Sequence, residues 1–146
     1  MLFSLGAPAA RAADSALAGL RAVATNSSFE EAVRRLEESI AANEMLLVAK
    51  ASASAGAAAR GLAIPGNAVL LVFRNDYAVR MLKASIPAGI EAPLRFYVTE
   101  DADGKATLSY RVPSAVFAPY VGGDLMLMAA ELDRVFAKIV QDAFGQ

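Results

Sequence analysis

Hydrophobic and polar positions alternate with period two in the second half of the chain. Residues 94–99 alternate apolar with polar or aromatic side chains, and residues 107–112 do so again after Asp101-Ala102-Asp103-Gly104. Such alternation is typical of strands that bury one face and leave the other in solvent. The two segments therefore predict a β-hairpin with one solvated face.

Two further segments carry apolar residues at helical spacing. The first begins at Ser28, which forms a capping box with Glu31, and ends at Asn43, where a left-handed cap is expected. The second opens at Asp124 and closes at Gly145. The stripes are Phe29, Val33, Leu36 and Ile40 in the first, and Leu125, Met128, Leu132, Val135 and Ile139 in the second. On the polar face, Glu30–Arg34 and Glu31–Arg35 have the spacing of helix ion pairs.

The remaining elements follow from shorter signals. A strand is expected in the second half of residues 16–25, a buried strand at 45–51, a short helix or ordered loop at 52–61, and a central strand at 68–73. Asp76 opens a predicted helix that runs to Ser85 with Val79 and Leu82 inward and ends before Pro87. The pattern predicts one compact α+β domain over residues 19–146, in the order β-α-β-(α)-β-α-β-β-α. Its sheet is mixed or antiparallel, with helices mainly on one face.

Composition narrows the classes of function. Hydrophobic residues make up 56% of the 146 positions, but charged residues interrupt every apolar stretch before it reaches the ~20 residues of a membrane span. The 14 basic and 15 acidic residues are interleaved, so the chain has no basic stripe for nucleic acid. It has no Cys, His or Trp, which removes the thiol nucleophile, the usual proton shuttle and the commonest metal ligands. We therefore expect no metal, no cofactor and no catalytic residues.

The first residues resemble an export signal. An apolar run from Met1 leads to Ala10-Arg11-Ala12, a small-x-small pattern suited to signal peptidase, although the run is short and lacks a basic start. Residues 1–18 are interpreted as the remnant of a signal peptide or as a disordered tail. The first interpretation predicts a periplasmic or otherwise exported protein, and the alternative is cytoplasmic.

The best candidate for a ligand site lies where the central strand ends. Arg74, Asn75 and Asp76 follow that strand and open a helix, whose free N–H groups and arginine would suit an anion. Tyr97, Tyr110 and Arg111 on the hairpin could wall the same crevice. In the plainer alternative, Asp76 only caps its helix, Arg74 lies on the surface, and the tyrosines belong to the core or to an interface.

Two other groups of residues have plain alternatives. Lys50 and Ser52 share a strand face, as a Ser–Lys nucleophilic pair would require, but a surface lysine and a helix cap explain them more simply. Glu100, Asp101 and Asp103 lack the longer ligand ladder of a calcium loop and fit a solvated hairpin turn.

The last helix is more apolar than one buried stripe requires. Met126 and Leu127 extend its apolar surface beyond Leu125 and Met128. This second face is expected to pack on a partner, most simply a second copy in a two-fold homodimer, or on another part of the same domain.

Several segments together resemble the domain-of-unknown-function 302 family of bacteria and archaea. The similarity spans about residues 20–120. It rests on the first helix (residues 28–36), the end of the central strand (70–75), Pro93-Leu94, the hairpin turn (100–105) and residues 108–113. The resemblance implies a compact α+β fold that is often dimeric and exported, without an established activity. Relatives often carry Asp-His where this chain has Ser52 and Ala53, and Gly or Cys before Asn-Pro where it has Arg74-Asn75-Asp76.

These observations predict a non-catalytic, exported module that binds a small or anionic ligand, or a protein partner, as a homodimer. The alternative is an enzyme that uses carboxylate, Lys or Tyr acid–base groups in the crevice near Arg74–Asp76.

Overall fold

The computed structural model describes residues 18–145. The predicted signal remnant or tail therefore lies outside the described residues, apart from Ala18. Five strands form one antiparallel sheet in the order β1-β5-β4-β3-β2. The strands are β1 (Leu20–Ser28), β2 (Leu46–Ala51), β3 (Asn67–Phe73), β4 (Leu94–Glu100) and β5 (Lys105–Arg111).

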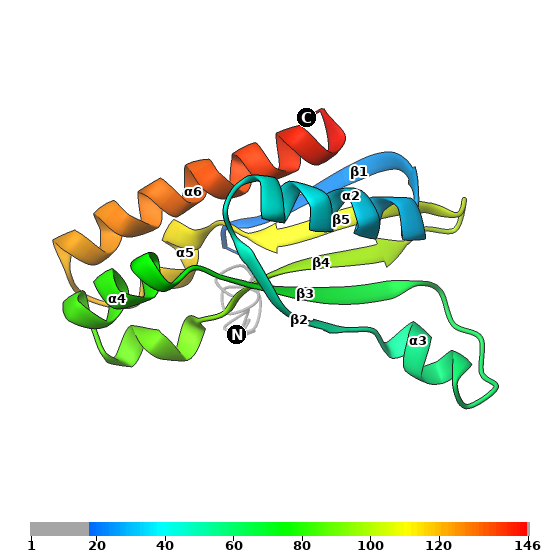
Figure 1. Ribbon diagram of the computed structural model, residues 1–146, viewed down its shortest axis with the longest axis horizontal. Helices are drawn as coiled ribbons and strands as arrows, with labels where there is room; N and C mark the ends of the chain where they lie inside the picture. The colour runs from blue at the N-terminus through cyan, green and yellow to red at the C-terminus, as the bar shows by residue number, and fades with distance from the viewer. Residues whose placement is uncertain (1–17, 146) are drawn as a thin grey trace, which may run out of the picture.

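The helices cover one face and one end of this sheet. Figure 1 shows α2 (Phe29–Ala42) and the long α6 (Gly123–Phe144) side by side over one face, with α4 (Asn75–Ala84), the 3-10 helix η1 (Pro87–Glu91) and α5 (Pro113–Phe117) at one end. The short α3 (Ala53–Ala58) follows β2 at the opposite end. The predicted α+β class, element order and one-sided packing are confirmed. No helix within residues 18–145 is long and apolar enough to cross a membrane.

The start of α2, the end of α6 and the β4–β5 hairpin follow from short-range interactions that the sequence predicted. The Oγ of Ser28 accepts a hydrogen bond from the backbone N–H of Glu31, so Ser28 caps α2 as expected. The reciprocal half of the predicted capping box is absent, because the Glu31 carboxylate binds Arg34 and Arg35 instead. Gly145 is left-handed, with φ of 71°, and ends α6. The hairpin pairs β4 with β5, and its turn is closed by a hydrogen bond from Asp101 N to Lys105 O.

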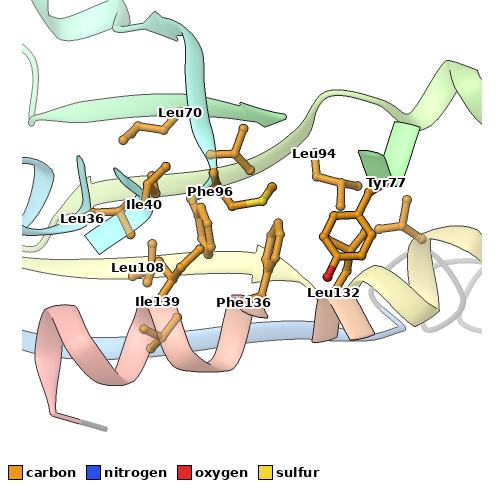
Figure 2. Packing of buried hydrophobic residues seen from close by; sticks show 14 of the residues in the cluster. Leu36, Ile40, Leu70, Tyr77, Leu94, Phe96, Leu108, Leu132, Phe136 and Ile139 are labelled. Carbon is orange, nitrogen blue, oxygen red and sulfur yellow. The ribbon is translucent and has the colours of Figure 1, made fainter. Parts of the chain in front are cut away.

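The core lies between the sheet and the two long helices. Figure 2 shows Leu36 and Ile40 of α2 beside Leu70, Leu108 and side chains of α6. At its centre Phe96 of β4 stacks on Phe136 of α6 with ring centroids 4.5 Å apart. Ser39 adds a polar link between the helices, because its buried Oγ donates to Ile139 O at 2.7 Å. The aromatic stack and this hydrogen bond fix α6 over the sheet.

Two local expectations about β2 and the end of α2 were wrong. The strand β2 is not buried but is an exposed edge of the sheet, next to β3 alone. The left-handed residue after α2 is Glu44 (φ 60°), whereas Asn43 has φ of −97°. Whether β2 is buried depends on which segments pack against it, and the local pattern does not contain that information. The pattern likewise does not show that the left-handed turn comes at Glu44, one residue after Asn43.

The inward face of α4 also differs from the expectation. Val79 and Leu82 are exposed, and Tyr77 and Met81 are buried instead. Asp76 does not cap the helix, because its carboxylate binds the side chain of Arg74. The helix is rotated relative to the expectation, since its contact with α6 decides which side chains face the core.

Candidate functional site

A cavity of about 390 Å³ opens where β4 begins and β5 ends. Leu20, Leu94 and Val116 supply apolar wall, and the polar lining residues are Glu91, Arg95, Tyr97, Ser109, Tyr110 and Arg111. Three of these, Tyr97, Tyr110 and Arg111, were predicted as site residues. The volume lies in the range of small-molecule sites.

Arg95 and Arg111 are neighbours on adjacent strands of this cavity. In the register that pairs Phe96 with Tyr110, Arg95 and Arg111 are the next residues on the two strands, and both alternate away from the helical layer. Both side chains are exposed, and neither makes a hydrogen bond or ion pair with any residue of 18–145. Two unpaired guanidinium groups therefore border one cavity.

The two tyrosines of the cavity differ in role. Tyr97 lies opposite Ser109 on the uncovered face, and 41% of its surface is exposed. The ring of Tyr110 contacts Phe96 and Phe136 at centroid distances of 5.4 Å and 5.9 Å, so it belongs to the core side of the sheet. Burial raises the pKa of the Tyr110 hydroxyl. Tyr110 is therefore neutral near neutral pH and serves mainly as wall.

Glu91 places one negative charge among the lining residues. Its Oε1 accepts a hydrogen bond at 2.8 Å from the hydroxyl of Tyr120, which joins η1 to the loop before α6. The carboxylate acceptor raises the pKa of Tyr120. With Arg95 and Arg111 the charged lining groups sum to a net charge of +1, which favours an anion.

The predicted site at Arg74–Asp76 lies in a different part of the surface. Arg74 donates from Nε to Asp76 Oδ1 at 2.7 Å and from Nη2 to Asp76 Oδ2 at 3.0 Å, and its guanidinium lies 4.2 Å from the centroid of the Tyr77 ring. The Arg74 hydrogen bonds lower the pKa of Asp76. Each charge of this pair therefore already has a partner of opposite sign.

Two hollows border Arg74, and neither matches the predicted crevice. The first, with Tyr77 and Phe117, encloses about 30 Å³, which is room for little more than a water molecule. The second measures about 370 Å³ and is shared with Arg134 and Lys138, but Arg74 and Lys138 are both held in ion pairs. Asn75 is exposed on the first turn of α4 and lines neither hollow.

Lys50 and Ser52 do not form a nucleophilic pair. Lys50 Nζ donates to Glu37 Oε1 at 2.6 Å, and the Ser52 hydroxyl accepts from Ala55 N at 3.1 Å and caps α3. The acidic residues of the hairpin turn all accept hydrogen bonds from the protein, and Glu100 Oε2 accepts from Gly66 N at 2.6 Å. Asp101 accepts from the Thr107 hydroxyl, and Asp103 accepts from Lys105 N. Among residues 18–145, no group of three or more potential His, Cys, Asp or Glu ligands could hold a metal ion.

The structure thus divides the predicted site residues into separate groups. Tyr97, Tyr110 and Arg111 share one cavity, whereas Arg74 and Asp76 lie apart from it. Sequence reasoning missed Arg95, although a signal existed. Counting back along the hairpin from its turn places Arg95 across from Arg111 on the solvated face.

The comparisons with known proteins now identify the family. The model of the family described as "Domain of unknown function DUF302" matches residues 21–143. The chain belongs to the DUF302 family. No curated protein matches the chain.

The crystal structure of an uncharacterized conserved DUF302 protein from Bacillus stearothermophilus shares the fold. It superposes with a TM-score of 0.76 and 19% sequence identity, covering 86% of this chain and 98% of that one. At this identity the likeness concerns the fold and not the residues of the cavity. The arginine pair is therefore described for this DUF302 chain alone.

Proposed function

We propose that the chain is a non-catalytic module that binds a small anionic ligand in the cavity between Arg95 and Arg111, and that it acts as a homodimer. The observation that carries the ligand-binding proposal is the pair of unpaired guanidinium groups on one cavity. Export remains a prediction from the first residues of the sequence.

Like charges on directly opposite strand positions destabilise a sheet. A pair of arginines that binds no carboxylate of residues 18–145 therefore leaves a local repulsion that an anion would relieve. Guanidinium groups match carboxylate and phosphate oxygens with two parallel hydrogen bonds each. The ligand class that fits is thus a small molecule with a carboxylate or phosphate group.

The rest of the cavity favours a ligand with an apolar or aromatic part. Tyr97 offers a partly exposed ring, Ser109 offers a hydroxyl, and Leu20 and Val116 supply apolar surface. Ligand sites commonly combine such a wall with a few polar groups that fix orientation.

The alternative of an enzyme near Arg74–Asp76 has less support. A general acid or base needs a pKa close to the working pH, but the Arg74 hydrogen bonds move the pKa of Asp76 downward. Of the two hollows beside Arg74, the one of about 30 Å³ would not accept a substrate. In the one of about 370 Å³, Arg74 and Lys138 are already held in ion pairs.

Titration with inorganic phosphate and with succinate, followed by backbone NMR, tests the ligand proposal. We expect saturable shifts at β4 and β5 in the wild type, and an affinity about tenfold or more lower in Arg95→Gln and Arg111→Gln, because each removes a charged hydrogen-bond donor. Arg60→Gln is the matched control, since Arg60 is an exposed arginine outside the cavity. Absence of saturable shifts with both anions, or equal affinities in all variants, would refute the proposal.

A further inference from the structure

The end of the molecule at α4, η1 and the start of α6 carries four large apolar side chains that are more exposed than any others in the described residues. In Figure 1 these elements lie together at the end opposite α3. We call this surface the end patch, and its residues with their exposed fractions are Leu82 (46%), Ile86 (77%), Ile90 (81%), Val121 (92%) and Leu127 (66%).

Several contacts connect the elements that carry these residues. Gly89 lies against Leu82, because a Cβ built on the glycine would be 3.0 Å from Leu82 Cδ2. Leu127 lines one hollow with Lys83 and Ala84 of α4. The hydrogen bond from the Tyr120 hydroxyl to Glu91 ties the loop that carries Val121 to η1. The end patch is therefore a feature of the packed tertiary structure rather than a run of sequence.

Large exposed apolar side chains gathered at one end of a soluble domain indicate an interaction site. The sequence places Leu127 on a second apolar face of α6, and this face is predicted to pack on a partner or on another part of the domain. Its exposure rules out the alternative that another part of residues 18–145 covers it.

The charges beside the end patch point to a second copy of the chain. A hollow of about 280 Å³ is lined by Arg80, Lys83, Asp124 and Leu127. Arg80 is already bound to Glu131 by two hydrogen bonds of 2.7 Å and 2.8 Å. Lys83 and Asp124 make no hydrogen bond or ion pair with any residue of 18–145. One unpaired charge of each sign therefore lies beside exposed apolar surface.

We infer that the end patch is the homodimer interface, with Lys83 of each copy opposite Asp124 of the other. In a two-fold interface, if residue i of one copy meets residue j of its partner, then residue j also meets residue i. Lys83 and Asp124 meet this requirement, because one surface holds both halves of the pair. The inference rests on the homodimer part of the proposed function and is independent of the anion cavity.

Mixing of charge-reversed variants tests this pairing. In the Lys83→Glu variant, the new glutamate of one copy would face Asp124 of the other. In the Asp124→Lys variant, the new lysine would face Lys83, so each variant brings like charges together. We expect each variant to dissociate about tenfold or more readily than the wild type in sedimentation experiments at micromolar concentration. An equimolar mixture should restore dimers, because each interface then joins opposite charges at both contacts. If Lys83 and Asp124 instead paired within one chain, mixing would not restore the dimer. A mixture that stays dissociated would therefore refute the inference.

Apolar substitutions provide the second measurement. Leu127→Glu and Ile90→Glu should each give monomers, while Leu62→Glu, at a position 52% exposed in the loop after α3, should leave the dimer unchanged. Circular dichroism of each variant separates loss of the dimer from loss of the fold.

The outcomes separate this inference from the rest of the proposal. A monomeric wild type refutes both the homodimer and its surface, whereas a dimer that survives all of these variants refutes the surface alone. A wild-type monomer that sediments with vesicles of phosphatidylglycerol and phosphatidylethanolamine, and loses this with Ile90→Glu, would assign the end patch to lipid instead. If the wild type is a dimer, the Arg95→Gln variant should remain dimeric as well, because Arg95 lies outside the end patch.

Discussion

Arg95 of β4 and Arg111 of β5 line one cavity on neighbouring strands, and neither side chain has an ion partner among residues 18–145. Such an arrangement costs stability when the cavity is empty and is favourable when an anion bridges the two groups. This pair therefore links the stability of the chain to its proposed ligand.

Arg95→Gln should have opposite effects in the absence and presence of ligand. Without an anion, its free energy of unfolding should rise by about 0.2–1 kcal/mol, because one of two like charges is removed. With phosphate in excess, the wild type should gain more stability than the variant, since only it retains both donors. Urea unfolding with and without phosphate measures both effects. A wild type that gains no more than Arg95→Gln would contradict the explanation.

Phe136→Ala should be among the most destabilising substitutions in the chain. The ring is fully buried and stacks on Phe96 while also contacting Tyr110. Its loss should lower the free energy of unfolding by about 3–5 kcal/mol, out of the total of about 5–15 kcal/mol typical of a domain. Guanidinium unfolding provides the measurement. The control Leu62→Ala, at an exposed loop position, should stay within about 0.5 kcal/mol of the wild type.

Glu31 should titrate far below an ordinary glutamate. Hydrogen bonds from Arg34 and Arg35 lower the pKa of its carboxyl from 4.5 to about 2. A carboxyl with a lowered folded pKa stabilises the fold above its unfolded pKa, and this contribution is lost as the pH falls from 4.5 through about 2. The carboxyl carbon of Glu31, followed by NMR, should show its midpoint at about 2.

The matched variant for this titration is the double substitution Arg34→Gln with Arg35→Gln. It removes both donors while leaving the glutamate in place, so the midpoint of Glu31 should move upward toward its ordinary value. A midpoint that stays unchanged would show that the two arginines are not the cause.

Glu44→Gly should stabilise the chain. Glu44 holds a left-handed conformation, with φ of 60°, which costs a residue with a Cβ more than it costs glycine. The free energy of unfolding should rise by about 0.5–1 kcal/mol in thermal or urea unfolding. Ala41→Gly, three residues earlier and inside α2, should instead lower it by about 1 kcal/mol. A decrease in both variants would mean that the left-handed turn carries no strain.

The elements that sequence reasoning predicted most accurately have local causes. The N-cap at Ser28 and the cap at Gly145 each act within a few residues of the chain. The alternation of β4 and β5 around a short turn likewise fixes their pairing, because a hairpin register follows from the turn.

The errors arose where burial depends on distant segments. Residues 45–51 have the composition of a buried strand, but β2 lies at the edge because β3 pairs with β4 on its other side. On α4, Tyr77 and Met81 rather than Val79 and Leu82 face the core, since the packing against α6 selects among two apolar stripes.

The candidate site followed the same division. The sequence by itself determined that Tyr97 and Arg111 lie on a solvated hairpin, and that the chain lacks Cys and His, because alternation and composition are local properties. Only the tertiary structure decided that Arg74 is bound to Asp76, that Arg95 joins Arg111 at one cavity, and that Lys83 and Asp124 flank exposed apolar surface. Whether a charge has a partner depends on which distant segments pack beside it, and no local pattern carries that information.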